Sequence, residues 1–179
     1  MADHSTSRLW LMRAAFVGIA LVTLLYHLLP LDLSPRRWAG PDLIMAIAFA
    51  WVLRRPEYVP ALSIGIVFFV ADLLYLNPPG LLAALVVIAC ESLKSRARSL
   101  RQQPFMVEWF NVSVTIVGLT LIYRAVLAIL LIPQASLLLS ATQAIATIAI
   151  YPVVVFVSRN LLGIHKSTLG EVNALGQRL

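Results

Sequence analysis

The sequence predicts an all-α membrane protein with six transmembrane helices, organised as a single domain over residues 1–179. Hydrophobic residues make up 60% of the chain and charged residues only 12%, and the mean hydropathy is +0.89. Water-soluble domains rarely combine so little charge with so much apolar surface. In addition, the basic residues gather in every second connection between apolar segments, which is typical of chains that cross a membrane repeatedly.

Six apolar segments follow one another along the chain. They cover residues 9–29, 38–53, 61–76, 81–93, 105–124 and 137–157, and a short tail follows at 158–179. A helix needs about 20 residues to span the hydrocarbon core of a membrane. The second and fourth segments reach that length only if flanking Arg and Lys side chains extend to the interface. A second segment that re-enters the membrane instead of crossing it is the alternative, and it leaves five crossings.

The distribution of basic residues favours six crossings with both termini in the cytoplasm. Under that topology eleven of the fourteen Lys and Arg residues lie inside: Arg8, Arg13, Arg54, Arg55, Lys94, Arg96, Arg98, Arg101, Arg159, Lys166 and Arg178. Arg36, Arg37 and Arg124 lie outside. Short cytoplasmic loops retain Lys and Arg, whereas five crossings would export one basic cluster. We therefore expect the net charge of +6 to face anionic membrane lipid and not nucleic acid.

Motifs for catalysis or metal binding are missing from the sequence. It has no glycine-rich phosphate loop and no Gly-x-Ser-x-Gly turn. His4, His27 and His165 are too far apart in the chain to suggest a metal site. The single cysteine, Cys90, cannot form an internal disulfide. We expect no catalytic, cofactor-binding or metal-binding residues, and a protein that is not an enzyme.

Acidic residues within or next to the apolar segments are the more informative signals. Asp42 follows Pro41, which we place in the first turn of the second segment. Asp42 either interacts favourably with the helix dipole or has a role in the interior of the fold. Asp72 lies within the third segment, where a carboxylate has to face protein or the interface. We expect it to bond to a polar group on a neighbouring helix or turn. Glu91 is expected to pair with Lys94 at helical spacing.

Two polar stripes follow helical spacing in the last two segments. One consists of Glu108, Asn111, Thr115 and Gly118, and the other of Ser140, Gln143, Thr147 and Tyr151. Glu108 stands in the first turn of its helix, which suits a carboxylate. The stripes have two interpretations: contacts between helices through small and hydrogen-bonding residues, or a polar cavity for a small ligand.

The tail carries a third periodic pattern. Leu169, Val172, Leu175 and Leu179 recur at helical spacing, so residues 167–179 are a candidate amphipathic helix. Such a helix lies on the inner membrane face or docks on a cytoplasmic partner. A frayed terminus is the alternative, because Gly170 and Gly176 weaken such a helix.

Three runs resemble the MreD family, the small rod-shape-determining membrane proteins of bacteria. They are GPDL at 40–43, WVLRRPEYVP at 51–60, and ADLL at 71–74 leading to PPGL at 78–81. The resemblance covers about residues 8–165 and includes the size of the chain. There is one departure: the family often has a glycine one turn before the aspartate of the third segment, where this chain has Phe68.

The resemblance implies a fold similar to the six-helix substrate-binding subunit of energy-coupling-factor transporters, and a location in the bacterial inner membrane. It implies a non-catalytic scaffold of the cell-wall elongation machinery. The partners would be a bitopic MreC-like protein, the peptidoglycan glycosyltransferase and transpeptidase, and an actin-like filament protein. The alternative is a small-molecule-binding subunit of a transporter. The candidate structural or partner-contact residues are Pro41, Asp42, Arg55, Pro56, Asp72, Glu108, Asn111, Thr115, Gln143 and Thr147.

Overall fold

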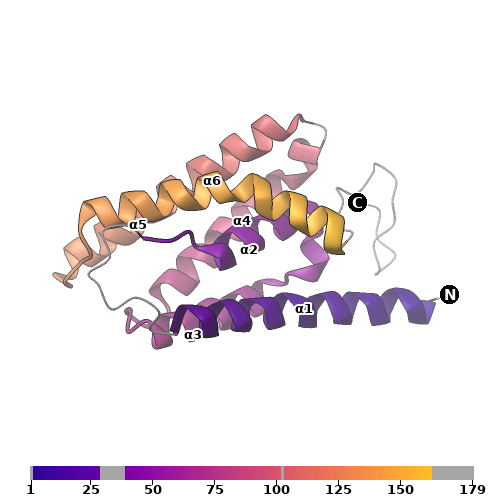
Figure 1. The fold of residues 1–179 in the computed structure, drawn as a ribbon, viewed down its shortest axis with the longest axis horizontal. Coiled ribbons are helices and arrows are strands. Elements are labelled where there is room, and N and C mark those ends of the chain that lie inside the picture. Colours follow the sequence, from indigo (N-terminus) through magenta and orange to yellow (C-terminus); the bar gives the residue numbers. More distant parts are fainter. Residues whose placement is uncertain (1, 29–38, 102, 163–179) are drawn as a thin grey trace.

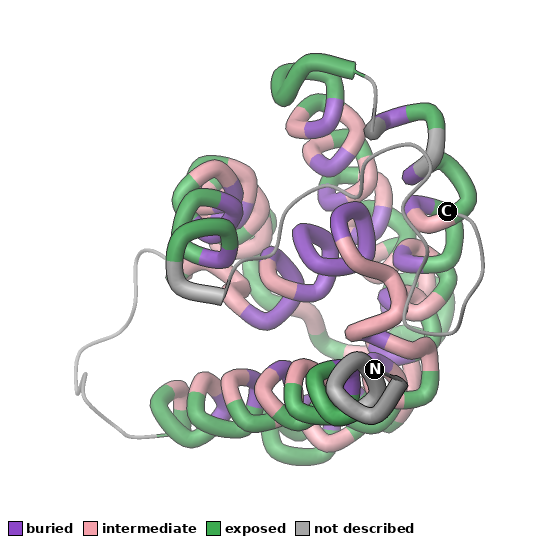
Figure 2. The backbone as a smooth tube through the Cα atoms, turned by 90° about the vertical axis from the view of Figure 1, so that its right-hand side faces the viewer, coloured by how far each residue is buried: buried purple, intermediate pink, exposed green. Residues whose placement is uncertain are grey.

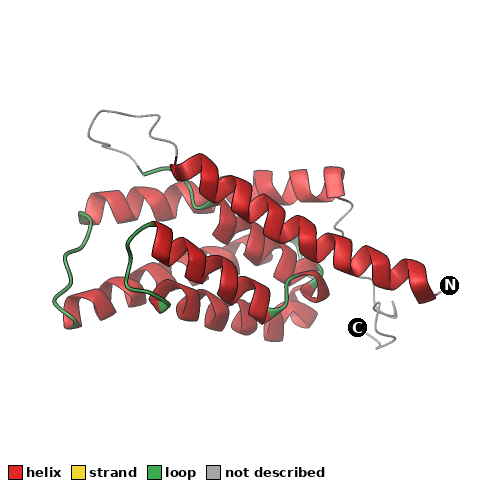
Figure 3. Cartoon of the chain, turned by 90° about the horizontal axis from the view of Figure 1, so that it is seen from below, coloured by secondary structure: helices red, strands yellow, loops and turns green. Residues whose placement is uncertain are grey.

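The computed structural model describes residues 2–28, 39–101 and 103–162, and all of its regular elements are helices (Figure 3). In chain order they are α1 (Ala2–Leu28), α2 (Leu43–Arg54), the short 3-10 helix η1 (Pro56–Tyr58), α3 (Ala61–Leu74), α4 (Leu81–Arg101), α5 (Phe105–Ile129) and α6 (Leu137–Leu162). The predicted helix at 167–179 lies outside the described residues, as do Arg36, Arg37 and Trp38.

The long helices run along the long axis of the molecule (Figure 1). The first residues of α1 and the last residues of α6 lie at the same end of the bundle (Figure 1). We call this the near end, and it also holds the last residue of α2, Arg54, and the first turn of α5. The opposite end, which we call the far end, holds the start of α2 and the turns that join α3 to α4 and α5 to α6.

Helix α2 forms the core of the bundle. Ten of its twelve residues are buried, and it packs chiefly against α4 and α6. A helix that is apolar on all sides can face protein or lipid, and the burial of nearly every residue shows that α2 faces protein. At about 1.5 Å per residue it is roughly 18 Å long, well short of the ~30 Å hydrocarbon core. The expected segment at 38–53 is therefore described as a shorter, interior helix that begins at Leu43.

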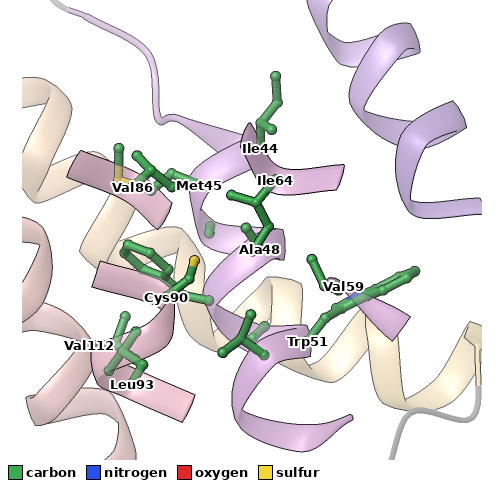
Figure 4. Packing of buried hydrophobic residues seen from close by; sticks show 14 of the residues in the cluster. Ile44, Met45, Ala48, Trp51, Val59, Ile64, Val86, Cys90, Leu93 and Val112 are labelled. Atoms are coloured by element: carbon green, nitrogen blue, oxygen red, sulfur yellow. The ribbon is translucent and has the colours of Figure 1, made fainter. Parts of the chain in front are cut away.

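The core around α2 includes buried residues of α1, α3, α4, α5 and α6. Figure 4 shows part of it, with Ile64 of α3, Cys90 of α4 and Val112 of α5. Trp51 is fully buried and its ring lies 5.8 Å from that of Phe16 in α1. Ala46, Ala48 and Ala50 have no exposed surface, so neighbouring helices approach the α2 backbone closely. Buried positions gather toward the middle of the bundle and exposed ones face outward (Figure 2).

The outward faces are apolar, as a membrane requires. Three helical stretches are long and apolar enough to cross a bilayer: Ser7–Leu28, Phe105–Ile129 and Leu137–Asn160. The apolar helices Leu43–Arg54 and Ala61–Leu74 are shorter. The outward side of α3 exposes Leu62, Ile66, Phe69 and Leu73 at helical spacing. These features indicate a multi-pass helical membrane protein.

Helix α4 differs from its prediction. The apolar segment was expected to end at residue 93 and a basic loop to follow, yet the helix continues to Arg101. The cause lies in its buried side, where Leu93, Ala97 and Leu100 keep helical spacing and stay packed. The exposed side of the same turns carries Lys94 and Arg96, so the basic residues extend a helix of the bundle.

Helix α6 continues through Pro152. Proline has no backbone N–H, so the carbonyl of Ile148, four residues earlier, loses its usual helical donor. The indole N–H of Trp109 on α5 donates to that carbonyl at 3.0 Å. A side chain of the neighbouring helix thus replaces the missing backbone bond and ties α5 to α6.

Candidate functional site

The near end contains a buried cluster of three polar side chains from three helices, which we call the near-end triad: Arg54, Glu108 and Tyr151. Arg54 Nη1 donates to Glu108 Oε1 at 2.5 Å, and the Tyr151 hydroxyl donates to the same oxygen at 2.9 Å. Glu108 and Tyr151 have no exposed surface, and Arg54 is 5% exposed. The triad therefore joins α2, α5 and α6 inside the buried core.

Local structure brings these three groups together. Arg54 is the last residue of α2, where a cation interacts favourably with the carbonyl end of the helix. Glu108 stands in the first turn of α5, where a carboxylate is equally favourable. The Tyr151 ring stacks on Phe105 at a centroid distance of 6.4 Å, which fixes the direction of its hydroxyl. Trp51 reinforces the junction, because its indole N–H donates to Ser158 Oγ on α6 at 3.1 Å.

Glu108 lies in a first turn as predicted, but its partner Arg54 was not predicted. Arg54 was expected in an inner loop, and that expectation is wrong: it belongs to α2 and is buried. Arg54 stands next to Arg55 in a basic pair, and the sequence does not show which of the two is buried. Only Arg54 points into the core. Arg55 instead lies 3.5 Å from Glu57 Oε1, at the turn that Pro56 opens.

Asp72 on α3 caps a different helix. Its Oδ2 accepts the backbone N–H groups of Gly80 at 3.1 Å and of Ala83 at 3.3 Å. These amides belong to the start of α4, whose first N–H groups have no partner within the helix. Asp72 is fully buried. The prediction that it faces protein and bonds to a neighbouring helix or turn is confirmed.

At the far end, Asp42 caps its own helix and also joins α6. Its Oδ1 accepts the Met45 N–H at 2.9 Å, and its own N–H donates to Thr147 Oγ1 at 2.9 Å. Thr147 in turn donates to the carbonyl of Gln143 at 2.7 Å. Both expected roles of Asp42 therefore apply. Pro41 precedes the cap and does not lie in the first turn, which corrects its predicted position.

A cavity of about 310 Å³ opens at the far end between α5, α6 and the two far-end turns. Its apolar wall includes Met45, Leu82, Ile116 and Leu119. Its polar wall includes Asn77, Tyr123, Arg124, Gln134, Ser140 and Gln143. A second cavity of about 230 Å³ adjoins it and extends toward Thr23 and His27 of α1. The two share Asp42, Tyr75, Leu82 and Gln143 as lining residues.

Arg124 is fixed at the edge of the larger cavity. Its Nη1 donates to the Ala135 carbonyl at 2.9 Å and to Ser140 Oγ at 2.7 Å. Gln134 Nε2 donates back to the Arg124 carbonyl at 3.0 Å. No carboxylate within the described ranges pairs with this guanidinium. From the sequence, Arg124 was expected only on the outer side of the membrane. Its place near the end of an apolar segment was the feature that could have indicated a role in a polar site.

The two polar stripes behave differently. On α6, Ser140, Thr147 and Tyr151 each bond to another helix or to the segment leading into α2, and Gln143 lines both cavities. On α5, Asn111 and Thr115 donate to carbonyls four residues earlier in their own helix. A side chain added at Gly118 would meet nothing within 4 Å. Interhelical contact and cavity lining thus both apply to the α6 stripe, whereas in the α5 stripe only Glu108 bonds across helices.

The remaining polar pair lies on the surface. Lys94 Nζ is 3.2 Å from Glu91 Oε1, as predicted from their spacing. Within the described residues no group of three or more His, Cys, Asp or Glu side chains is arranged to hold a metal ion. Comparison of this chain with known protein families, with curated proteins and with solved structures finds no match.

We predict that breaking the near-end triad destabilises the fold far more than breaking the surface pair. Glu108→Gln or Arg54→Met should each cost about 3–5 kcal/mol, because the other charge stays buried without its counter-ion. The double variant Arg54→Met with Glu108→Met should cost clearly less than the two single costs combined. The free energy of unfolding in mixed detergent micelles measures each effect.

Glu91→Gln is the matched control for this cycle. Glu91 and Lys94 are roughly half exposed, so their pair is worth about 1 kcal/mol or less. Additive costs in the double variant, or equal costs for the triad and the surface pair, would contradict a coupled buried cluster.

Asp72 gives a second prediction. Asp72→Leu removes the cap of α4 and leaves buried amides unsatisfied, which should cost about 1–3 kcal/mol. Asp72→Asn keeps an oxygen acceptor and should cost less. Hydrogen exchange of the Gly80 and Ala83 amides should accelerate in Asp72→Leu. Leu73→Ala changes the exposed neighbour and serves as control; equal, mild effects at both positions would show that Asp72 caps nothing important.

Proposed function

We propose that this chain is a non-catalytic membrane scaffold of the bacterial cell-wall elongation machinery. In this role it would link an MreC-like bitopic protein, the peptidoglycan glycosyltransferase and transpeptidase, and an actin-like cytoplasmic filament. The resemblance of the runs at 40–43, 51–60 and 71–81 to the MreD family is the origin of the proposal. The bonds that Asp42 and Asp72 of those runs form between elements support it.

The observation that carries the proposal is that three acidic residues, Asp42, Asp72 and Glu108, each hold two elements together. Asp42 caps α2 and joins it to α6, Asp72 on α3 caps α4, and Glu108 on α5 binds Arg54 of α2. Asp42 and Asp72 accept hydrogen bonds from backbone amides, and Glu108 binds a buried arginine. Such bonds make the helix bundle rigid. A rigid bundle with apolar outer faces suits a protein whose task is to bind other membrane proteins.

A small-molecule-binding subunit of a transporter is the second candidate, and the far-end cavities favour it. They combine an apolar wall with a few convergent polar groups, which is typical of ligand sites. A scaffold does not require such a cavity. A ligand that stays bound through purification and is detected by native mass spectrometry would favour this candidate over the scaffold.

Both candidates share one topology, which we propose as six crossings with the near end and both termini in the cytoplasm. The placement of the ends of α1 and α6 at one end of the bundle supports it (Figure 1). Reporter domains fused after Gln103 and after Leu179 should both report the cytoplasm, and one inserted after Pro133 should report the periplasm. A periplasmic signal from either of the first two fusions would contradict the topology.

The scaffold role itself predicts a change of cell shape. Depleting this protein in its own bacterium should turn rods into rounded cells, and the tagged chain should co-purify with a bitopic membrane protein. Asp72→Leu should fail to restore shape, whereas Leu73→Ala should restore it, provided that immunoblots show equal amounts of both variants in the membrane. Rod shape that persists after full depletion would refute the scaffold role.

A further inference from the structure

We propose that the far-end cavity is a binding site for a small anionic amphiphile, with Arg124 as the receptor for its carboxylate or phosphate group. The inference goes beyond the scaffold role and deepens the transporter alternative by naming the ligand class. It concerns the cavity of about 310 Å³ that Arg124, Gln143 and Met45 help to line.

Arg124 is a charged residue in an otherwise apolar part of α5. This residue lies in α5, within a stretch long and apolar enough to cross a membrane. Ionisable side chains in such stretches are costly and face the bundle interior, a partner charge or an aqueous cavity. Arg124 Nη1 is occupied by Ala135 O and Ser140 Oγ, both neutral acceptors. Its Nε and Nη2 have no acceptor, and its charge no carboxylate, among the described residues.

The guanidinium of Arg124 is held in place before any ligand arrives. Two bonds from Nη1, to the Ala135 carbonyl and to Ser140 Oγ, fix its position on the cavity wall. Guanidinium groups bind carboxylates and phosphates through parallel N–H donors. A fixed guanidinium loses little side-chain entropy on binding, which favours an anion at this point.

The rest of the cavity wall combines apolar and neutral polar side chains. Met45, Ile116 and Leu119 offer an apolar surface, and Asn77 and Gln143 offer neutral hydrogen-bonding groups. The volume is at the lower end of the range of about 300–1,000 Å³ found for ligand pockets. It fits a small ligand or the head of a lipid, but not a whole lipid.

Asp42 sets the orientation of the ligand. It is the acidic residue of the cavity lining, and its Oδ1 is engaged by the Met45 amide. Its carboxyl group accepts a hydrogen bond at the start of α2 and offers an anion no cationic partner on that side. The anionic group therefore lies toward the turn between α5 and α6, beside Arg124, and the apolar body lies toward α2 and the apolar part of α5.

Binding can be measured on the full chain in phosphatidylcholine nanodiscs. Cys90 is the single cysteine and is 1% exposed, so a thiol-reactive fluorophore that labels it on heating reports unfolding. Ligand bound to the folded state raises the melting temperature, and the rise grows with the logarithm of the ligand concentration relative to its Kd. The probes are 4-phenylbutyrate and its uncharged analogue 4-phenylbutanol. A second set of nanodiscs contains phosphatidylglycerol and no added probe.

We expect 4-phenylbutyrate, phosphatidylglycerol or both to stabilise the chain, and 4-phenylbutanol to have little effect. Stabilisation by the soluble acid identifies a soluble ligand, and stabilisation by phosphatidylglycerol alone identifies a lipid headgroup. Arg124→Gln should weaken binding about tenfold to a hundredfold, the usual worth of a charged hydrogen bond. Arg159→Gln changes an exposed arginine of α6 and should leave the response intact.

A second variant keeps the test informative if Arg124→Gln unfolds. Ala144→Phe fills the cavity and should abolish the response, whereas Ala141→Phe on the exposed side of α6 should not. The melting curve without ligand shows whether each variant is folded. Equal stabilisation by the acid and the alcohol, no stabilisation by either anion, or an unchanged response in folded Ala144→Phe would overturn the proposal. Cell shape plays no part in this readout, so its failure is separate from failure of the scaffold role.

Discussion

The buried contact between Arg54 and Glu108 constrains the rest of this fold. It fixes the last residue of α2 to the first turn of α5, and the Tyr151 hydroxyl adds α6 through the same carboxylate oxygen. Helix α2 is by itself shorter than the hydrocarbon core is thick, and ten of its twelve residues are buried, so its position depends on the helices around it. A buried charge pair tolerates little displacement of either partner, because separation leaves both charges in a low-dielectric core. These contacts therefore hold α2, α5 and α6 in fixed positions relative to one another at the near end.

Capping across elements continues this pattern toward the far end. Asp72 of α3 accepts the first amides of α4, and the amide of Asp42 donates to Thr147 of α6. Trp109 donates to the Ile148 carbonyl that Pro152 leaves without its helical donor. In each case a backbone group that water would satisfy in a soluble protein is satisfied by another helix. Within a membrane an unsatisfied backbone group costs several kcal/mol, so these bonds determine which helices lie next to each other.

Periodicity and charge predicted the helical class of the fold, the interhelical role of Asp72 and the polar stripe of α6. They did so because a helix repeats every ~3.6 residues and because a carboxylate in an apolar segment needs a donor. The partner of Glu108 was not predictable in this way. Arg54 and Arg55 are adjacent in a basic pair, and only tertiary packing decides which of them turns inward. The length of α4 was missed for a related reason: its basic residues suggested a loop, whereas its buried residues Ala97 and Leu100 maintain the helix.

The ends of α3 and α5 give the far-end cavity its shape. Helices α3 and α5 both end with a leucine in the left-handed region, Leu76 at φ 54° and Leu131 at φ 55°. The residue after each donates back to the helix, Asn77 to the Asp72 carbonyl at 2.9 Å and Ile132 to the Leu127 carbonyl at 3.0 Å. These are the bonds of a Schellman motif, in which glycine is the usual left-handed residue. Asn77 and Ile132 both line the cavity. Its rim is therefore formed by hydrogen-bonded helix ends that hold leucine at a backbone angle it disfavours. A rim built in this way defines the cavity before any ligand enters, which reduces the ordering cost that binding would otherwise carry.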